Sequence, residues 1–402
     1  MKFKANALVL GLMWAAVVAS TASAQPYDAG ASNKEVKIGQ TKPYSGPASA
    51  YSIGGKTQLR YFDMINANGG VNGRKIVLLS EDDSYSPPKT VEKIRKLVEQ
   101  DEVLFLASMT GTATNIAVRD YVNGAAVPHL LVGSGSSKFN DPKGYPWSMG
   151  FVPNYHREGR IFATYIVKNH PGKKIGILYQ NDDSGKDALS GLKEVLAANG
   201  RPKDLVIETS YESTDPTVDS QVIAMQAAGA EVIYLFCLPR VTAQVIRKKT
   251  DIGYNPALFI TNVGSSVATA LAPAGLDNAK GVVTAQYLKD PSDAAVQQTD
   301  DYKAYKAFAE KWMPEANLND NSMVQGYVEA QIIQQIVAQA GNNLTRKNIL
   351  KQSHNLDFVP GMILDGIRIK TSDSDNLMVH QLALSRFDGK KWVPFSEVIG
   401  SD

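Results

Sequence analysis

The sequence predicts an α/β protein built from two lobes, each a doubly wound parallel sheet with helices on both faces. From Val36 onward, short continuous apolar segments alternate with segments of helical periodicity, and this alternation begins again after about residue 155. Strands of a parallel sheet covered on both faces read as unbroken apolar segments. Residues 366–395 differ, because apolar and polar positions alternate there, which is typical of antiparallel strands.

The first series of elements predicts the sheet of the first lobe. Its strands are VKIG at 36–39, KIVLLS at 75–80, VLFLAS at 103–108 and VPHLLV at 127–132. Three helices lie between these strands. The first covers 53–67, the second has apolar positions 91, 94, 97 and 98, and the third begins near Thr112. Gly69 and Gly70 supply the residues that end the first helix.

The second series predicts the other lobe. Pro146 and Pro153, with aromatic residues between them, mark the first crossing between the lobes. A helix over 156–168 and strands at 173–179, 204–209, 231–236 and 257–261 follow. The segment 281–290 is a second crossing, after which the polar, helix-rich residues 293–352 return to the first lobe. Asp388-Gly389 forms the turn of the antiparallel ending.

The N-terminus predicts export. Lys2 and Lys4 precede the apolar residues 7–19, and the small-residue pattern of Ala22 and Ala24 follows, so residues 1–24 are read as a secretory signal peptide. No other segment approaches the roughly 18 consecutive apolar residues of a membrane span. We therefore expect a soluble, exported mature chain.

Charge and cysteine content exclude other classes of protein. The chain has 42 Lys+Arg and 40 Asp+Glu, and removing Lys2 and Lys4 leaves 40 of each. The mature chain is formally neutral without a basic run, so we expect no nucleic-acid partner. Cys237 is the only cysteine, so no intramolecular disulfide is possible.

No set of catalytic residues is apparent. The sequence has no G-x-S-x-G, no H-E-x-x-H and no pair of histidines at metal-ligand spacing, so we predict a protein that is not an enzyme and has no cofactor or metal. Cys237 follows a predicted strand and is read either as a nucleophile or as a small apolar residue. Adjacent acids such as Asp82-Asp83 and Asp182-Asp183 point to opposite faces and are better suited to capping.

The ends of the predicted strands favour a binding cleft. In open parallel sheets, ligands lie beyond the carboxyl ends of the strands. These ends carry hydroxyl residues, glycines and helix N-termini, where free N–H groups attract anions. The loop TKPYSGPASAY at 41–51 adds Tyr44 and Tyr51, which we place at the mouth of the cleft. The alternative for this loop is a turn that only breaks the strand.

The sequence resembles the periplasmic solute-binding proteins of ABC transporters, in the leucine/isoleucine/valine-binding group. The resemblance is carried by IGQTKPYSGPASAYSIGG at 38–55, by residues 65–98, by VPHLL at 127–131, by KKIGILYQNDDSGKDALSGLKEVL at 173–196 and by the antiparallel ending. It implies a type I periplasmic-binding fold with a three-segment hinge and a monomer in the periplasm. It also implies delivery of a small-molecule ligand to an ABC permease and ATPase complex in the inner membrane. On this reading the first lobe covers 34–151 and 286–357, and the second covers 152–285 and 358–402.

The resemblance also implies ligand-binding residues. The family's ligand-contacting tyrosine matches Tyr51, and its hydroxyl-rich turn that holds the ligand carboxylate matches Gly111 and Thr112. The second carboxylate-binding loop matches Gly133, Ser134 and Gly135. In the second lobe the sequence departs from the family: Ser184 replaces a common aromatic residue, Cys237 stands about where a tyrosine is expected, and Asn262 stands where amino-acid binders carry a glutamate.

The missing glutamate favours a small aromatic or aliphatic carboxylate without an α-ammonium group. A closed cleft without an anionic partner for the ammonium group would lose a buried ion pair, at a cost of about 3–5 kcal/mol. A branched-chain or other amino acid is the alternative, with an acid such as Asp183 in the missing role. Arg240 either meets a second polar group of the ligand or is a solvated residue at a helix start. Two other classes remain open, an exported hydrolase and the sensing partner of a receptor.

Overall fold

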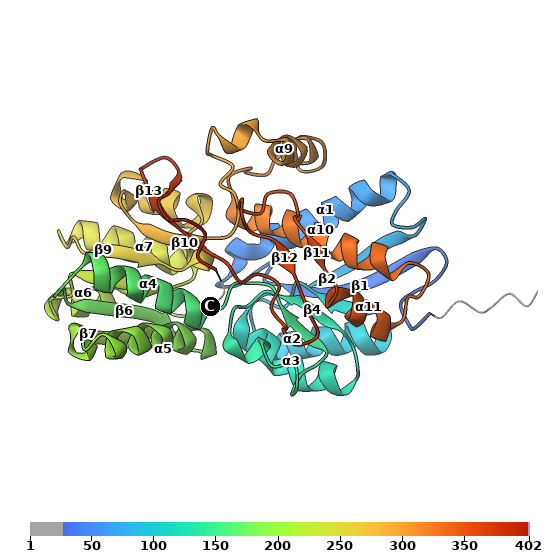
Figure 1. The fold of residues 1–402 in the computed structure, drawn as a ribbon, viewed down its shortest axis with the longest axis horizontal. Helices are drawn as coiled ribbons and strands as arrows, with labels where there is room; N and C mark the ends of the chain where they lie inside the picture. The colour runs from blue at the N-terminus through green and yellow to red at the C-terminus, as the bar shows by residue number, and fades with distance from the viewer. Residues whose placement is uncertain (1–26, 401–402) are drawn as a thin grey trace, which may run out of the picture.

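The computed structural model describes residues 27–400, so the predicted signal peptide lies outside the described residues. Two lobes lie side by side (Figure 1), each with its own sheet. The first lobe has a five-stranded sheet of order β2-β1-β3-β4-β5, and the second has a seven-stranded sheet of order β14-β13-β10-β9-β8-β6-β7. The predicted α/β fold with two wound sheets is confirmed.

All strand pairs of the first sheet are parallel. Its strands are β1 (Glu35–Lys42), β2 (Lys75–Asp82), β3 (Phe105–Ala107), β4 (His129–Val132) and β5 (Ser148–Gly150). The helices of this lobe are α1 (Ser52–Ala67), α2 (Pro87–Arg95), α3 (Thr112–Gly124), α10 (Asn321–Ala340) and α11 (Arg346–Ser353). Buried strands such as β3 and β4 are fully apolar or nearly so, as a sheet covered on both faces requires.

The second sheet combines parallel strands with an antiparallel edge. Its strands are β6 (Ile175–Gln180), β7 (Leu205–Tyr211), β8 (Val232–Phe236), β9 (Ala257–Ile260), β10 (Val283–Gln286), β13 (Ala383–Phe387) and β14 (Trp392–Pro394). Its helices are α4 (Tyr155–Asn169), α5 (Asp183–Ala198), α6 (Asp219–Ala227), α7 (Pro239–Asp251) and α8 (Ala272–Ala274). β13 pairs antiparallel with β10 and β14, and the hairpin turn contains Gly389 at φ +103°, as the Asp-Gly signal predicts.

Three segments connect the lobes. The first joins β5 to α4, and the second leaves β10 and leads to α9 (Asp300–Trp312). The third contains β11 (Asp357–Phe358) and β12 (Ile369–Lys370), which pair with each other, and reaches β13. A bridge between Gly150 and Leu377 holds the third segment beside the first lobe. The predicted boundary between the lobes lies after residue 357. The residues that follow it first form the small sheet of β11 and β12, which belongs to neither large sheet, and then make the contact at Leu377.

The return of the chain to the first lobe depends on two facing glycines. In Figure 1, α10 lies beside α1, although the two are far apart in sequence. Gly326 of α10 faces the backbone of Gly54 in α1, and a Cβ atom on Gly326 would clash with that backbone. The close approach of these helices brings the inner face of α10 to the carboxyl end of β1.

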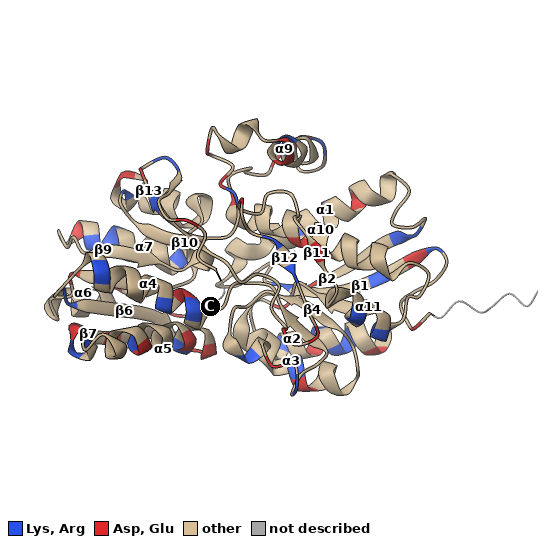
Figure 2. Ribbon diagram, viewed as in Figure 1, with Lys and Arg blue, Asp and Glu red and all other residues tan. Residues whose placement is uncertain are grey.

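Charged residues of both signs are distributed over both lobes, as Figure 2 shows. Within residues 27–400, none of the helices combines the length and apolar character needed to cross a bilayer.

His129 of β4 is fully buried and supports a turn at the cleft. Its Nε2 lies 2.7 Å from Asn115 Oδ1, and the Asn115 amide donates to the carbonyls of Met109 and Gly111. The Asn115 oxygen is an acceptor, so Nε2 carries the proton of a neutral ring. Burial, together with the charge of Arg119, lowers the pKa of His129 to about 3.

The lowered pKa predicts a loss of stability in mild acid. An unfolded histidine has a pKa of about 6.5, so between pH 6.5 and 3 the unfolded chain binds more protons at this site. This contribution is complete above pH 6.5 and is lost as the pH falls. We expect the free energy of unfolding to fall by about 2 kcal/mol more between pH 7 and pH 5 in the wild type than in His129→Gln. Urea denaturation at both pH values measures this, and equal losses in the two proteins would contradict it.

Candidate ligand-binding site

A cavity of about 60 Å³ lies between the two lobes, at the carboxyl ends of the strands of both sheets. One water molecule needs roughly 10–15 Å³ of such space, so the cavity suits only a compact ligand or a few waters. Six of the predicted site residues line it: Tyr51, Gly111, Thr112, Gly133, Ser184 and Cys237. Ser134, Gly135, Arg240 and Asn262 are not among its lining residues.

The start of α3 is the polar corner of the first lobe. Gly111 has φ +104°, which turns the chain from the strand end into the helix. Thr112 is 2% exposed, and its Oγ1 lies 2.6 Å from Ser134 Oγ. The first N–H groups of α3, beginning with Thr112, have no acceptor within the helix and suit an anion. Ser134 therefore acts behind Thr112 and not at the cavity surface.

Three N–H groups at the residues matched to the carboxylate-binding loops, those of Gly111, Gly133 and Ser134, are engaged elsewhere. Gly111 N–H donates to Gly133 O at 3.1 Å, and Gly133 N–H donates to Met109 O at 2.8 Å. Ser134 N–H donates to Val132 O, while Gly135 packs against Pro153 and Tyr155. These bonds continue the pairing between β3 and β4 beyond the strand ends. The N–H groups of Gly111, Gly133 and Ser134 are therefore not available to a ligand carboxylate, whereas the first N–H groups of α3 are.

Tyr51 spans the cleft, whereas Tyr44 does not reach it. The Tyr51 hydroxyl donates to Val263 O of the second lobe at 3.0 Å. Burial raises the pKa of Tyr51, so the hydroxyl stays protonated. Tyr44 lies instead 2.5 Å from Ser80 Oγ, hydroxyl to hydroxyl, and is not a cavity residue. Of the two tyrosines expected at the mouth of the cleft, only Tyr51 lines the cavity.

The wall from the second lobe is uncharged. Ser184 donates its hydroxyl to Asp182, which caps the N-terminus of α5. Cys237 Sγ lies 3.6 Å from Leu178 O, and burial raises the pKa of this thiol. A protonated thiol is a poor nucleophile, so Cys237 serves as a small cavity-wall residue.

Arg240 and Asn262 are held away from the cavity. The Arg240 guanidinium donates to the carbonyls of Ser213, Asp215 and Pro216. Asn262 donates its N–H and its side-chain amide to Glu158 at 2.8 and 2.7 Å. Of the two alternatives for Arg240, contact with the ligand is the one that the structure contradicts, because carbonyls of the 213–216 loop occupy its donors.

Sequence reasoning missed the charged end of the cavity. Lys42, at the end of β1, and Glu329, on α10, both line the cavity, as does Gln325 one helical turn before Glu329. Lys42 lies within the 41–51 loop, and a lysine at the end of a buried strand is a usable signal of a functional site. Gln325 and Glu329 lie one helical turn apart on α10, and Glu329 is the only charged residue of this helix, which is a second signal.

Aromatic side chains form the remaining walls. Tyr85 comes from the first lobe, and Tyr155 and Phe236 come from the second. The Tyr155 and Phe236 rings pack edge to face with centroids 4.8 Å apart. Tyr85 and its neighbour Ser84 have φ of +57° and +52°, a backbone turn that presents the Tyr85 ring at the cleft. Tyr85 OH accepts a 3.4 Å hydrogen bond from Gln180 across the cleft. Such walls suit the apolar body of a ligand.

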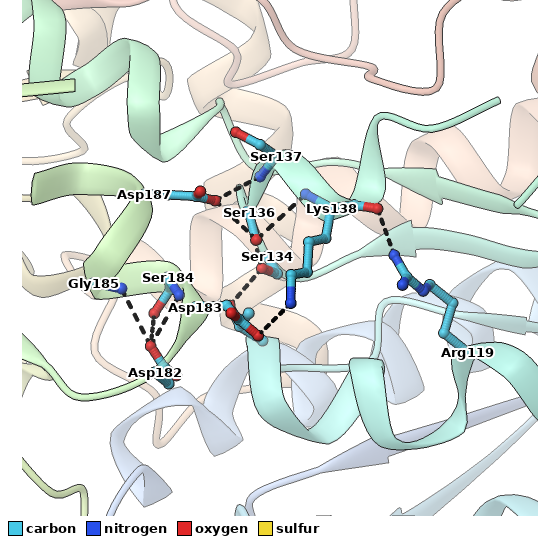
Figure 3. Close-up of polar contacts among 11 residues, drawn as sticks. Arg119, Ser134, Ser136, Ser137, Lys138, Asp182, Asp183, Ser184, Gly185 and Asp187 are labelled. Atoms are coloured by element: carbon cyan, nitrogen blue, oxygen red, sulfur yellow. Dashed lines mark hydrogen bonds and ion pairs between the residues drawn. The ribbon is translucent and has the colours of Figure 1, made fainter. Parts of the chain in front are cut away.

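The lobes are closed on each other beside the cavity. Figure 3 shows two acids of α5 facing the loop that follows β4. Asp187 accepts from Ser136 Oγ at 2.9 Å and from Ser137 N–H at 2.7 Å. Asp183 pairs with Lys138 at 3.0 Å at the surface. Asp183 is therefore not a cavity residue, and its suggested role as acceptor of a ligand ammonium is corrected.

Within residues 27–400, no group of three or more His, Cys, Asp or Glu side chains is arranged to hold a metal ion.

Sequence comparison supports a binding protein. The periplasmic binding protein family model matches residues 35–391. An amino acid binding protein of Pseudomonas aeruginosa is 25% identical over 57% of this chain and 61% of its own length. A Leu/Ile/Val-binding protein homolog of Brucella melitensis is 24% identical over 51% of this chain. The alignment covers only 55% of that relative, so the chain matches less than two thirds of either protein.

Solved structures show the same fold. A branched-chain amino acid ABC transporter protein from Thermus thermophilus with bound valine has a TM-score of 0.81 at 15% identity, covering 92% of this chain and 97% of its own. An ABC transporter solute-binding protein from R. palustris in complex with 4-hydroxybenzoate has a TM-score of 0.77 at 17% identity, covering 92% and 98%. The family model spans both lobes, so the chain belongs to the periplasmic binding protein family, and Leu/Ile/Val-binding protein homologs are among its relatives.

Proposed function

We propose that this protein is the periplasmic ligand-binding subunit of an ABC importer, and that it closes on a small carboxylate without an α-ammonium group. One observation carries the ligand class: Glu329 is the only acid among the described residues that line the cavity, and it already has a cationic partner in Lys42. The second-lobe wall, where an ammonium partner is expected, has none. Thr112 and the start of α3 are the proposed carboxylate site.

Charge balance disfavours an amino-acid ligand. Glu329 accepts from Gln58 and Gln325, and Lys42 lies beside it. A ligand ammonium group would have to displace one of these partners and approach the Lys42 ammonium group. An uncompensated charge in the closed cleft costs about 3–5 kcal/mol, most of the roughly 8 kcal/mol of a micromolar complex.

An amino acid is the second candidate, and the relatives support it. One solved structure of the same fold contains valine, whereas another contains 4-hydroxybenzoate, so the fold accommodates both classes in different proteins. The aromatic walls of this cavity fit either an aromatic or an aliphatic body.

The proposed location in the periplasm rests on the signal-peptide pattern, and the proposed partners, a permease and ATPase in the inner membrane, rest on the family. We further propose that the protein is a monomer and binds its ligand without turnover, which separates it from an exported hydrolase.

A panel of matched ligands tests the ligand class. The panel contains benzoate, 4-hydroxybenzoate, butanoate, 4-hydroxybutanoate, succinate, leucine and valine. A ligand at 100 times its dissociation constant stabilises the protein by about 2.7 kcal/mol, so thermal shifts detect binding and calorimetry measures Kd. We expect at least one acid to bind more tightly than leucine and valine. Tighter binding of leucine or valine would contradict a ligand without an α-ammonium group and support the amino-acid alternative. Chemical conversion of a ligand would indicate an enzyme.

Lobe closure is the second part of the test. Because the lobes are joined by three segments, ligand binding should rotate them together and reduce the radius of gyration in small-angle scattering. In Asp187→Ala, two inter-lobe hydrogen bonds are lost, so several times more ligand should be needed for the same compaction. Asp63→Ala, an exposed acid of α1, is the control. A radius that does not change with saturating ligand would exclude closure.

A further inference from the structure

Lys42 and Glu329 form a buried but loosely paired set of charges at the first-lobe end of the cavity. Their side chains are 4% and 1% exposed, and Lys42 Nζ lies 3.8 Å from Glu329 Oε2, beyond ordinary hydrogen-bond distance. The Lys42 stem passes over Gly55 of α1, where a Cβ would lie 2.7 Å from Lys42 Cγ. The absence of a side chain at Gly55 leaves space for the lysine to reach the cavity.

The two partners differ in how their hydrogen-bonding capacity is used. Glu329 Oε2 accepts from Gln58, and Glu329 Oε1 accepts from Gln325 at 2.8 Å. Gln325 is in turn held by Tyr287. Lys42 Nζ, by contrast, donates no hydrogen bond within 3.5 Å to any residue of the described range 27–400. A buried ammonium group with unused donors that faces a cavity is suited to an incoming oxygen atom.

Another buried lysine shows what a structural ion pair looks like in this protein. Lys289 is 7% exposed, and its Nζ lies 2.8 Å from both Asp301 and Asp365. Its charge is compensated by direct contacts, and it does not line the cavity. Lys42 lacks such contacts although it is more deeply buried, which sets it apart from a lysine that only stabilises the fold.

We propose that Lys42 is a specificity-determining residue, whose ammonium group donates to a second oxygen of the ligand while Thr112 and the start of α3 hold the carboxylate. The inference rests on the proposed function and narrows it. The ligand class is a compact acid with a second oxygen acceptor, which is a hydroxyl, a carbonyl or a second carboxylate. Glu329 keeps Lys42 in place and offsets its charge, so a neutral oxygen is accepted as well as an anionic one.

Matched pairs of acids test this role. We compare Kd values by calorimetry for benzoate against 4-hydroxybenzoate, and for butanoate against 4-hydroxybutanoate and succinate. A hydrogen bond from a charged donor corresponds to about ten- to a hundredfold in affinity. In the wild type, at least one oxygenated acid should bind about tenfold or more tightly than its partner. In the double variant Lys42→Met/Glu329→Gln, the Kd values of the oxygenated acid and its partner should differ by no more than about threefold.

The variants separate specificity from folding. The double variant removes both charges of the pair, and the other acid near Lys42, Asp83, keeps its hydrogen bonds from Tyr85 N–H and Thr90 Oγ1, so the double variant can be compared even if Lys42→Met alone does not fold. Lys289→Met is the matched control, which should keep the ratio of Kd values. Glu329→Gln removes the nearer of the two acids that act on Lys42, leaving only Asp83, and should tighten succinate relative to butanoate.

Each outcome has a distinct meaning. Equal binding of both members of every pair by the wild type would overturn the role of Lys42 and leave the proposed acid-binding function intact. If the oxygenated acid still binds about tenfold more tightly than its partner in the double variant, the role of Lys42 is overturned as well. If no acid of the panel binds, the proposed function fails, and the role of Lys42 fails with it.

Discussion

Replacing Thr112 by valine is expected to weaken binding of the tightest acid of the panel by about ten- to a hundredfold. Valine has the shape of threonine without the hydroxyl, and Thr112 is a buried cavity residue at the first position of α3. Hydrogen bonds to charged groups contribute roughly 1.5–3 kcal/mol. Calorimetry gives the change in Kd, and thermal melts confirm that the variant is folded.

Two variants identify the cause of that loss. Thr112→Ser keeps the hydroxyl and should bind within a few-fold of the wild type. Thr112→Val should weaken benzoate and 4-hydroxybenzoate by the same factor, because the carboxylate is common to both. If the valine variant binds like the wild type, the carboxylate does not bind at the start of α3.

Replacing Glu158 by alanine is expected to lower the free energy of unfolding by about 3–5 kcal/mol. Glu158 of α4 is fully buried in the second lobe and accepts from Thr261 Oγ1 at 2.6 Å, from Tyr234 OH at 3.1 Å, and from the backbone and side-chain N–H groups of Asn262. Burial raises the pKa of Glu158, and these four donors oppose the rise. Alanine would leave all of them without their acceptor in an apolar interior.

Urea denaturation measures this loss. Glu194→Ala on the adjacent α5 is the control, because Glu194 is about half exposed and pairs with His156 and Arg160 at the surface. It should cost less than about 1 kcal/mol. Glu158→Gln keeps one acceptor oxygen and should have an intermediate effect. A Glu158→Ala variant as stable as the Glu194→Ala variant would show that the Thr261–Asn262 loop does not depend on this acid.

The Glu158 contacts also explain the departure at Asn262. The amino-acid binders that the sequence resembles carry a glutamate at this loop, and its absence here predicted a ligand without an α-ammonium group. The structure shows that an acid from α4 occupies the space behind the loop and bonds to Asn262, whereas Val263 O faces the cleft and accepts from Tyr51. The acid is present in this lobe, but its oxygens are used to hold the loop and it does not line the cavity.

Apart from β5 and β10, which lie in segments expected only as crossings between the lobes, the sequence by itself determined the strands of the two wound sheets and the positions of their ends. These features follow from local patterns, since an unbroken apolar strand, a helical period and an Asp-Gly turn act over a few residues. Thr112, Ser184 and Cys237 could be placed at strand ends or helix starts for this reason, and all three line the cavity.

Only the tertiary structure decided which polar groups remain available at the cleft. Pairing between Thr110 and Gly133 continues beyond the strand ends and uses the N–H groups of Gly111 and Gly133. The contact of Gly54 with Gly326 brings Glu329 of α10 beside Lys42 of β1. A donor is free or engaged according to neighbours that are distant in the chain, so no local pattern records it, and the charged end of the cavity exists only once α10 has packed against α1.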